Sequence, residues 1–261
     1  EVIMNIADFS MDCFSLKGKA AIVTGGNSGL GSAFSVALAK AGADVFVASI
    51  MEDNGATKKM VEAEGRKYHA VHMDITQEGI PGKVVENCVS AYGSVDILVN
   101  CAGICLMADV LEFDKTKWDP MVAVNLSAAF EMSYEAAKVM VPRRQGKIIN
   151  ICSLFSFLGG QRSVAYAATK HGIAGLTKAY CDELAPHNIQ VNGIAPGYFD
   201  TALAADSSKD EKRYNKIKDH IPAGHWGNIA DLMGAVVFLA SPAANYVNGH
   251  ILTVDGGYLV R

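Results

Sequence analysis

The chain has 261 residues, of which 50% are hydrophobic and 19% charged, and its net charge is −4. This composition can form a large core, and the scattered Lys and Arg residues favour a small-molecule partner over nucleic acid or a membrane surface. No apolar stretch approaches the roughly 20 residues that span a bilayer, and the opening EVIMNIADFSMDC lacks a signal-peptide pattern, so we expect a cytoplasmic protein.

Short β-branched runs alternate with longer helical patterns along the chain. Several runs are apolar at consecutive positions, as in strands that are covered on both faces. The predicted strands are residues 20–24, 44–49, 69–74, 96–100, 147–152, 189–195 and 250–255. We therefore predict an α/β fold, a single-domain Rossmann fold whose seven-stranded parallel sheet carries helices on both faces.

Two segments depart from this alternation of strands and helices. Residues 1–15 precede the domain as an N-terminal arm, and the dinucleotide-binding catalytic domain is predicted at 16–261. The long segment 198–226 follows the sixth strand, where α/β folds bind ligands, and is predicted to be a substrate lid. Its charged stretch 207–219 could instead be a solvated helix.

The first predicted strand leads directly into the glycine-rich sequence TGGNSGLG at 24–31 and then into a helical pattern. A dinucleotide pyrophosphate binds at such a place, because the free N–H groups and the helix dipole favour an anion. A purely structural turn is the alternative, since the spacing is GxxxGxG and not GxGxxG. We expect cofactor contacts from Gly25, Asn27, Ser28, Gly29, Leu30 and Gly31.

Five further motifs follow in order: NCAG at 100–103, Asn125 in VAVNLS, Ser153 after the fifth strand, YAATK at 166–170, and Pro196–Gly197 after the sixth strand. In this order the chain resembles the short-chain dehydrogenase/reductase family over almost its whole length. The resemblance implies a nicotinamide-dependent oxidoreductase with Rossmann-type subunits, assembled as a homotetramer or, alternatively, a homodimer.

The chemistry of the YxxxK motif follows from its spacing. Tyr166 and Lys170 are four residues apart in a helical run, so they share one face of the helix. A free tyrosine has a pKa near ~10, and the lysine together with an oxidised nicotinamide would lower it, at about 1.4 kcal/mol for each unit. Ser153 can stabilise charge on the substrate oxygen. By resemblance, Asn125 completes the catalytic set, because it holds a helix kink and a water molecule that links Lys170 to solvent. A purely structural asparagine that bends the helix is the alternative.

The resemblance also implies the remaining cofactor contacts. Asp74 would accept from the adenine amino group, although it could instead cap a turn, and Ile75 would pack against the ring. Tyr166 and Lys170 would contact the cofactor as well as act in catalysis. The other implied contacts are Asn100, Ala102 and Gly103 at the adenosine half, and Pro196, Gly197 and Thr201 at the nicotinamide half.

The ribose site decides between the two nicotinamide cofactors. An acidic residue about 20 positions after the glycine turn usually marks NAD, and an arginine there marks NADP. Ser49 occupies that place and meets neither rule. Only Lys58 or Lys59 could reach a 2′-phosphate, so we predict NAD(H), with NADP(H) as the alternative.

The substrate prediction rests on resemblance in several segments: FSLKGK, LEFDKTKWD, IPAGHWG, DLMGAVVFLAS and NYVNGHILTVDGGYLVR. These resemble the branch that contains gluconate 5-dehydrogenases and 2-dehydro-3-deoxy-gluconate 5-dehydrogenases, which implies a keto or hydroxy sugar acid. We expect Ser153, Tyr166 and Arg162 to bind it, with Arg162 on the carboxylate. Arg162 could also face solvent. His225 and Trp226 could close over the sugar or merely anchor the lid.

Two other classes of protein remain open. A 3-oxoacyl-[acyl-carrier-protein] reductase would share every motif above, and the apolar Leu106 and Met107 would suit its acyl chain. Members of the sugar-acid branch often carry two arginines there. A non-catalytic dinucleotide-binding sensor typically lacks the tyrosine or lysine, and both are present here.

Cysteine and histidine spacing predicts neither disulfides nor a metal site. The chain has no CxxC pair and no HExxH motif, and its seven histidines are spread out. Most cysteines lie in apolar runs, so we expect core thiols in a reducing compartment. The six cysteines are Cys13, Cys88, Cys101, Cys105, Cys152 and Cys181.

Overall fold

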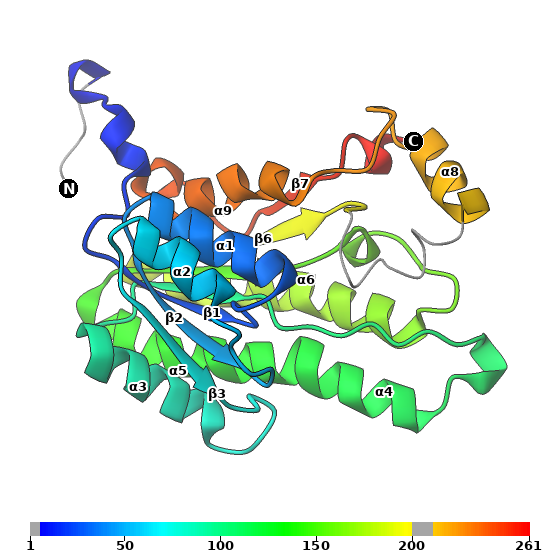
Figure 1. Cartoon of the computed structure of the whole chain (residues 1–261), viewed down its shortest axis with the longest axis horizontal. Helices are drawn as coiled ribbons and strands as arrows, with labels where there is room; N and C mark the ends of the chain where they lie inside the picture. Colours follow the sequence, from blue (N-terminus) through cyan, green and yellow to red (C-terminus); the bar gives the residue numbers. More distant parts are fainter. Residues whose placement is uncertain (1–5, 200–210) are drawn as a thin grey trace.

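The computed structural model describes residues 6–199 and 211–261. Its strands form one all-parallel, seven-stranded sheet in the order β3-β2-β1-β4-β5-β6-β7, which confirms the predicted fold class (Figure 1). The strands are β1 (Ala20–Thr24), β2 (Asp44–Ser49), β3 (Tyr68–His72), β4 (Ile97–Asn100), β5 (Gly146–Ile151), β6 (Ile189–Pro196) and β7 (Ile251–Val254). The order reverses direction between β1 and β4, which is where such sheets bind ligands.

Helices cover both faces of the sheet (Figure 1). Along β1, Ala21 and Val23 face one core cluster and Ala20 and Ile22 face the other, because alternate strand residues point to opposite faces. The first face packs against α1 (Gly29–Lys40), α2 (Ala56–Ala63) and α9 (Met233–Ala240), and the second against α3 (Ile80–Tyr92), α5 (Ala128–Arg143) and α6 (Val164–Leu184). The remaining described α-helices are α4 (Lys115–Val122) and α8 (Glu211–His220).

The N-terminal segment forms two short 3₁₀ helices, Ile6–Asp8 and Met11–Phe14, and extends away from the domain in Figure 1. The Phe14 ring lies 6.4 Å from the Phe238 ring of α9. Among the described residues, Leu16 is the first that is buried in the core, at 1% exposure. The buried part of the chain thus begins just after the predicted arm.

The described residues contain no group of side chains suited to a metal ion and no helix long and apolar enough to cross a membrane. All six cysteines are free. Cys88 and Cys152 are buried, whereas the other four are only partly so, which is less burial than the sequence predicts.

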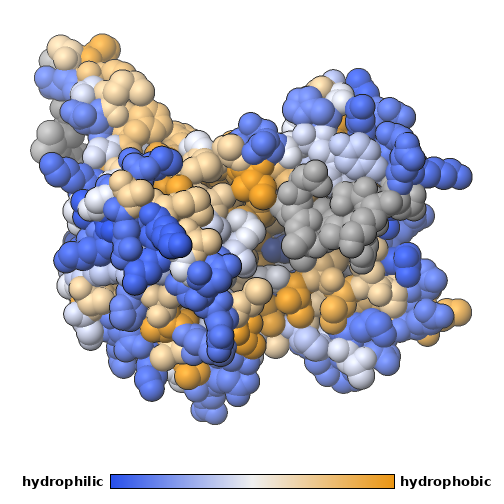
Figure 2. Space-filling view, viewed as in Figure 1, coloured by the Kyte–Doolittle hydropathy of each residue, from blue (hydrophilic) through white to orange (hydrophobic). Residues whose placement is uncertain are grey.

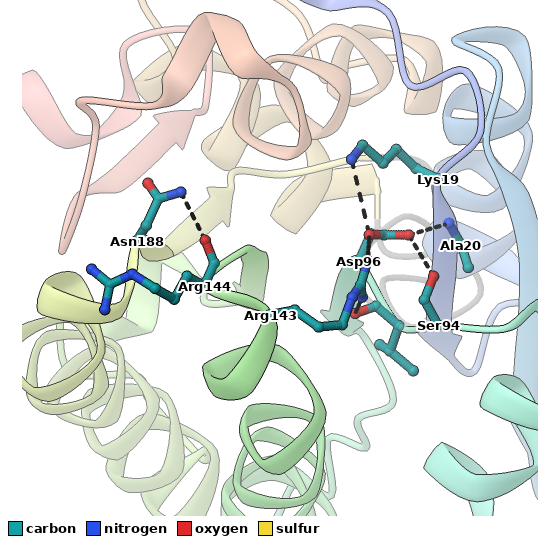
Figure 3. A network of polar contacts seen from close by, with 8 residues as sticks. Lys19, Ala20, Ser94, Asp96, Arg143, Arg144 and Asn188 are labelled. Atoms are coloured by element: carbon teal, nitrogen blue, oxygen red, sulfur yellow. Dashed lines mark hydrogen bonds and ion pairs between the residues drawn. The ribbon is translucent and has the colours of Figure 1, made fainter. Parts of the chain in front are cut away.

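A buried carboxylate joins β1, β4 and α5 at the end of the sheet where β4 begins (Figure 3). One oxygen of Asp96 accepts from the Ala20 backbone N–H and from the Ser94 hydroxyl, both at 2.9 Å. The other oxygen accepts from Arg143 at 2.8 Å. Burial raises the pKa of Asp96, but the hydrogen bonds from Ala20, Arg143 and Ser94 outweigh it and hold the pKa below its usual value.

We expect Asp96→Asn to lower the free energy of unfolding at neutral pH by about 2 to 3 kcal/mol, because it leaves charged and polar donors poorly paired. Since the folded pKa is depressed, the carboxylate stabilises the fold above the unfolded pKa of about 3.9, and this contribution is lost as the pH falls through the folded value. Urea denaturation at neutral and acidic pH measures the difference. Asp119→Asn, at an exposed ion pair, should cost no more than about 0.5 kcal/mol. Equal destabilisation by the two variants would contradict this role.

Candidate active site

The glycine-rich turn places backbone where a side chain would not fit. Gly25 has a φ of +68°, and a Cβ on Gly31 would lie 2.1 Å from the Gly25 carbonyl oxygen. Ser28 precedes the first helical residue, Gly29, and its side chain makes no capping hydrogen bond to α1. The first N–H groups of α1 therefore remain available for an anion, so the turn fits a dinucleotide pyrophosphate.

The polar residues beside this turn also fit a bound ligand. The Asn27 side chain donates from Nδ2 to the Met51 carbonyl oxygen at 2.9 Å, and Ser49 Oγ accepts from the Met51 N–H at 3.0 Å. Asn27 Oδ1 is buried and has no hydrogen-bond partner among the residues that the structure describes. Buried polar atoms are rarely left unpaired, so this oxygen can accept a donor from a ligand.

The loop after β4 lies against the glycine turn. Thr24 Oγ1 accepts from the backbone N–H groups of Cys101 and Ala102 at 2.9 and 3.0 Å, and a Cβ on Gly25 would lie 3.4 Å from Ala102 Cα. Ala102 thus lies at the predicted cofactor site. The Asn100 side chain instead points into the core, where it donates to Asn150 Oδ1 at 2.8 Å.

Asn125 lies in a π-helical turn, Ala123–Ser127, between α4 and α5. Its Oδ1 accepts from the Ile104 N–H at 2.8 Å, and its Nδ2 donates to the Ile104 carbonyl oxygen at 2.9 Å. A Cβ on Gly103 would lie 3.3 Å from the same Oδ1. From its π-helical turn, Asn125 therefore holds the loop after β4 in place through the Ile104 backbone. Its predicted role in binding a water molecule stays a prediction.

Ser153, Tyr166 and Lys170 come together at the carboxyl end of β5. Ser153 caps the short helix Leu154–Ser156, while Tyr166 and Lys170 lie one turn apart in α6. All three are less than 10% exposed. Lys170 Nζ donates to the Ile151 carbonyl oxygen at 2.6 Å and lies 5.5 Å from the centre of the Tyr166 ring. The buried group can hold a carbonyl oxygen and a proton donor together.

Burial dominates the electrostatics of this group. It raises the pKa of Tyr166, the Cys105 thiol raises it further, and a hydrogen bond with Ser153 lowers it. Burial lowers the pKa of Lys170. The lowered tyrosine pKa expected from the sequence is not found in the protein alone, because burial outweighs the hydrogen bond with Ser153. Tyr166 is thus held as a protonated phenol, which suits proton donation.

Asp74 follows β3 and caps the turn there. Its Oδ1 accepts from the Thr76 hydroxyl at 2.7 Å and from the Thr76 N–H at 3.0 Å, and these hydrogen bonds lower its pKa. Ile75 is 8% exposed and packs in the core. The structure thus contains the turn cap, and contact of Asp74 and Ile75 with adenine stays a prediction.

The end of β6 approaches the end of β7 closely. Pro196 is the last residue of β6, and a Cβ on Gly197 would lie 2.6 Å from Asp255 Cα. The Tyr198 ring follows and packs 5.3 Å from the Trp226 ring. Predicted Thr201 lies outside the described residues.

Trp226 anchors the described part of the predicted lid. Its ring stacks on Tyr214 of α8 with centroids 4.8 Å apart, and it is only 7% exposed. His225 Nδ1 lies 2.8 Å from the Trp226 carbonyl oxygen. The sequence leaves open whether Trp226 closes over the sugar or anchors the lid, and this packing fits the anchoring role.

Arg162 lies in the turn that leads into α6. It has a positive φ of 62°, and its Nε is 3.0 Å from Asp109 Oδ1, with half of its side chain exposed to solvent. Its predicted contact with a substrate carboxylate stays a prediction.

Cys105, which lies beside Tyr166, and Arg213, a half-buried residue of α8, are absent from the sequence-based set. Cys105 packs in the same small cluster as Tyr166. Burial raises the pKa of the Cys105 thiol, and a hydrogen bond with Ser163 opposes that effect most, followed by the positive charges of Lys170 and Arg213. Arg213 belongs to the charged stretch 207–219, where its spacing of four from the buried Ile217 could have identified an inward-facing position.

Comparison with known proteins places this geometry in a family. A family model described as enoyl-(acyl carrier protein) reductase matches residues 25–259. The chain belongs to the short-chain dehydrogenase/reductase family. The chain is an NAD(P)-dependent oxidoreductase of this family that acts on CH–OH groups.

Two relatives in Escherichia coli K12 match almost end to end. The uncharacterized oxidoreductase YgcW is 61% identical over 99% of both chains. A 2-dehydro-3-deoxy-D-gluconate 5-dehydrogenase is 44% identical over 96% of this chain and 99% of its own length. Among solved structures, a gluconate 5-dehydrogenase from Burkholderia cenocepacia J2315 in complex with NADP and tartrate has a TM-score of 0.91 at 37% identity, and covers 96% of this chain and 98% of its own. This short-chain dehydrogenase/reductase chain is therefore related to gluconate and deoxygluconate dehydrogenases.

Proposed function

We propose that the protein transfers a hydride between a nicotinamide dinucleotide and a keto group of a sugar acid of the gluconate or 2-keto-3-deoxygluconate type. The observation that carries this proposal is the 44% identity, over nearly the whole chain, to a 2-dehydro-3-deoxy-D-gluconate 5-dehydrogenase. The assembled Ser153, Tyr166 and Lys170 supply the acid/base chemistry that such a reaction needs.

The cofactor supplies or accepts the hydride when it is bound. Asn27 and Ser49 lie where its ribose would be held, and Asp74 and Ile75 would flank the adenine. Ala102 would pack beside the pyrophosphate turn. In this proposal the remaining cofactor contacts are Gly25, Ser28, Gly29, Leu30, Gly31, Asn100, Gly103, Tyr166, Lys170, Pro196, Gly197 and Thr201.

The protein's own residues handle the substrate oxygen and its proton. Ser153 donates a hydrogen bond to that oxygen, and Tyr166 gives it a proton during reduction. Lys170 lies one turn away and, with Asn125, supports the return of a proton to Tyr166. In alcohol oxidation the same groups remove the proton.

We propose NADH as the preferred cofactor. Of Lys58 and Lys59, the two lysines that the sequence offers for a 2′-phosphate, Lys58 lies 3.9 Å from the Glu62 carboxylate. Ser49, proposed for the ribose position, carries a neutral hydroxyl. The solved Burkholderia relative holds NADP, so the preference is a property to be measured. We expect kcat/KM to be higher with NADH; an approximately tenfold preference for NADPH, about 1.4 kcal/mol, would overturn the assignment.

A substrate panel tests the function. We expect reduction of 5-keto-D-gluconate or the 2,5-diketo 3-deoxy acid, and slow turnover of acetoacetyl thioesters. The partly exposed Leu106 and its neighbour Met107 favour the rival 3-oxoacyl-[acyl-carrier-protein] reductase. Efficient thioester reduction with no activity on any keto sugar acid would assign the enzyme to that class, and no reduction of any ketone would leave a dinucleotide-binding sensor. The homotetramer and the cytoplasmic location stay predictions.

A further inference from the structure

Ser156 links the two segments that carry the proposed catalytic residues. It ends the short helix Leu154–Ser156, which begins directly after Ser153. Its hydroxyl donates to the Lys170 carbonyl oxygen of α6 at 2.8 Å and accepts from the Ser153 backbone N–H at 3.2 Å. A carbonyl oxygen can only accept, and a serine hydroxyl has one hydrogen, so the direction of both bonds is fixed. One hydroxyl thus joins the backbone of Ser153 to the backbone of Lys170.

This hydroxyl is shielded from water. Figure 2 shows hydrophilic side chains over the outer surface of α8, where water competes for their hydrogen bonds. Ser156 is only 7% exposed, so both of its bonds form where competing water is scarce. An alanine at this position would leave the buried Ser153 N–H without this partner, since a methyl group cannot accept a hydrogen bond. The segment after β5 could then shift against α6.

The same short helix sets the direction of the Ser153 side chain. Ser153 Oγ accepts from the Phe155 N–H at 3.3 Å, in a capping box whose other half is the Ser156 hydroxyl. Because that N–H occupies a lone pair of the oxygen, the hydroxyl hydrogen can turn toward a substrate oxygen. Burial raises the pKa of Tyr166 and a hydrogen bond with Ser153 lowers it, so the two side chains lie within reach of each other. A displacement of about 1 Å between such groups can slow a reaction about 10²-fold.

A second bond joins the same segments, but it depends on the Lys170 ammonium. Lys170 Nζ donates to the Ile151 carbonyl oxygen at 2.6 Å. In the proposed function this ammonium also contacts the cofactor, so its donors are shared between two partners. The bond from Ser156 uses the Lys170 backbone and is independent of the ammonium. It therefore keeps the spacing of the two segments whichever partner the ammonium binds.

We propose that Ser156 is a positioning residue, which holds Ser153 in line with Tyr166 at the substrate oxygen. The inference rests on one part of the proposed function, that these two residues share that oxygen, and not on which ketone is reduced. In this role Ser156 acts through Ser153 and needs no contact with substrate or cofactor. The loss of its hydroxyl should therefore slow the reaction only while Ser153 has its own hydroxyl.

A double-mutant cycle tests this coupling. Steady-state kcat and KM would be measured, with NADH and the ketone that wild type reduces fastest, for wild type, Ser153→Ala, Ser156→Ala and the variant with both substitutions. We expect Ser153→Ala to lower kcat at least about 10²-fold and Ser156→Ala to lower it about 10-fold. The double variant should match Ser153→Ala within about twofold, because Ser156 then has nothing left to position. The KM for NADH should change less than about twofold in Ser156→Ala.

Ser241→Ala is the matched control. Ser241 is fully buried, and its hydroxyl donates to the Phe238 carbonyl oxygen at 2.9 Å, at the end of α9. This variant should keep wild-type kcat, while thermal unfolding and NADH titration show whether each variant is folded. Ser156→Thr keeps the hydroxyl and should regain most of the lost kcat. If Ser156→Ala does not fold, Ser156→Cys takes its place in the cycle, because a thiol has a similar size and weaker hydrogen bonds.

Each contrary outcome has a separate meaning. If wild type reduces no ketone, or if Ser153→Ala keeps wild-type kcat, the catalytic part of the proposed function is overturned and this inference with it. If Ser153→Ala is slow but Ser156→Ala keeps wild-type kcat, this inference alone is overturned. A double variant slower than Ser153→Ala by the full factor of Ser156→Ala would also overturn it, because the two residues would then act independently. An equal loss in Ser241→Ala would overturn it as well, since any buried serine would then have the same effect.

Discussion

Tyr166→Phe is expected to lower kcat by at least ~10²-fold while the protein still folds and binds the dinucleotide. The substitution removes only the phenol oxygen, which gives the proton to the substrate in the proposed reaction. The ring stays packed, because its edge-on contact with Phe155 at 5.8 Å does not involve the hydroxyl. Steady-state turnover and cofactor titration by NADH fluorescence measure the two effects separately.

Tyr180→Phe is a matched control on the same helix. Tyr180 is partly buried, and its hydroxyl donates to the Phe130 carbonyl oxygen at 3.1 Å, away from the catalytic group. Its loss should change turnover by less than about twofold. Near wild-type turnover in Tyr166→Phe, or an equal loss in the two variants, would show that Tyr166 is not the acid/base.

The second large effect is expected at Gly31. An alanine Cβ would lie 2.1 Å from the Gly25 carbonyl oxygen and 3.0 Å from Gly26 Cα. Both contacts are with backbone, so neither can rotate away, and the turn must open. We expect Gly31→Ala to weaken cofactor binding at least ~10²-fold, since the pyrophosphate depends on the close approach of that backbone.

Gly175→Ala provides the comparison for a helical glycine. A Cβ at Gly175 meets nothing within 4 Å among the described residues, so the variant should bind cofactor as wild type does and gain up to about 1 kcal/mol of stability. Cofactor titration and thermal unfolding of both variants test the pair. Wild-type affinity in Gly31→Ala would show that the turn does not carry the pyrophosphate.

The sheet was predictable because most of its strands, β1, β2, β4, β5 and β6, are buried on both faces and therefore read as apolar runs. The errors lie at strand ends. The predicted strand 69–74 ends at His72, since Asp74 turns its carboxylate onto Thr76. Strand 250–255 ends at Val254, because Asp255 accepts from the Gly257 N–H at 2.8 Å. An aspartate side chain accepts hydrogen bonds from nearby backbone N–H groups and so can end a strand. The hydrophobic pattern of the sequence does not reveal this.

The assembly of the proposed catalytic group was predictable from motifs placed at the carboxyl ends of neighbouring parallel strands, whereas its catalytic role stays a prediction. The electrostatics of the group were not predictable, because the direction of the Lys170 ammonium and the burial of Tyr166 depend on tertiary packing. Arg162 was chosen by proximity in sequence, which does not reveal its ion pair with Asp109, and its substrate contact stays a prediction.

Isotope transfer tests the central claim most directly. The enzyme would be incubated with 5-keto-D-gluconate or its 2,5-diketo 3-deoxy analogue and NADH carrying deuterium at either face of the nicotinamide C4, and the product examined by NMR and mass spectrometry. One deuterium at the former carbonyl carbon of the sugar acid, from one labelled face only, is the predicted result. Deuterium transfer to a 3-oxoacyl thioester but to no sugar acid would contradict it.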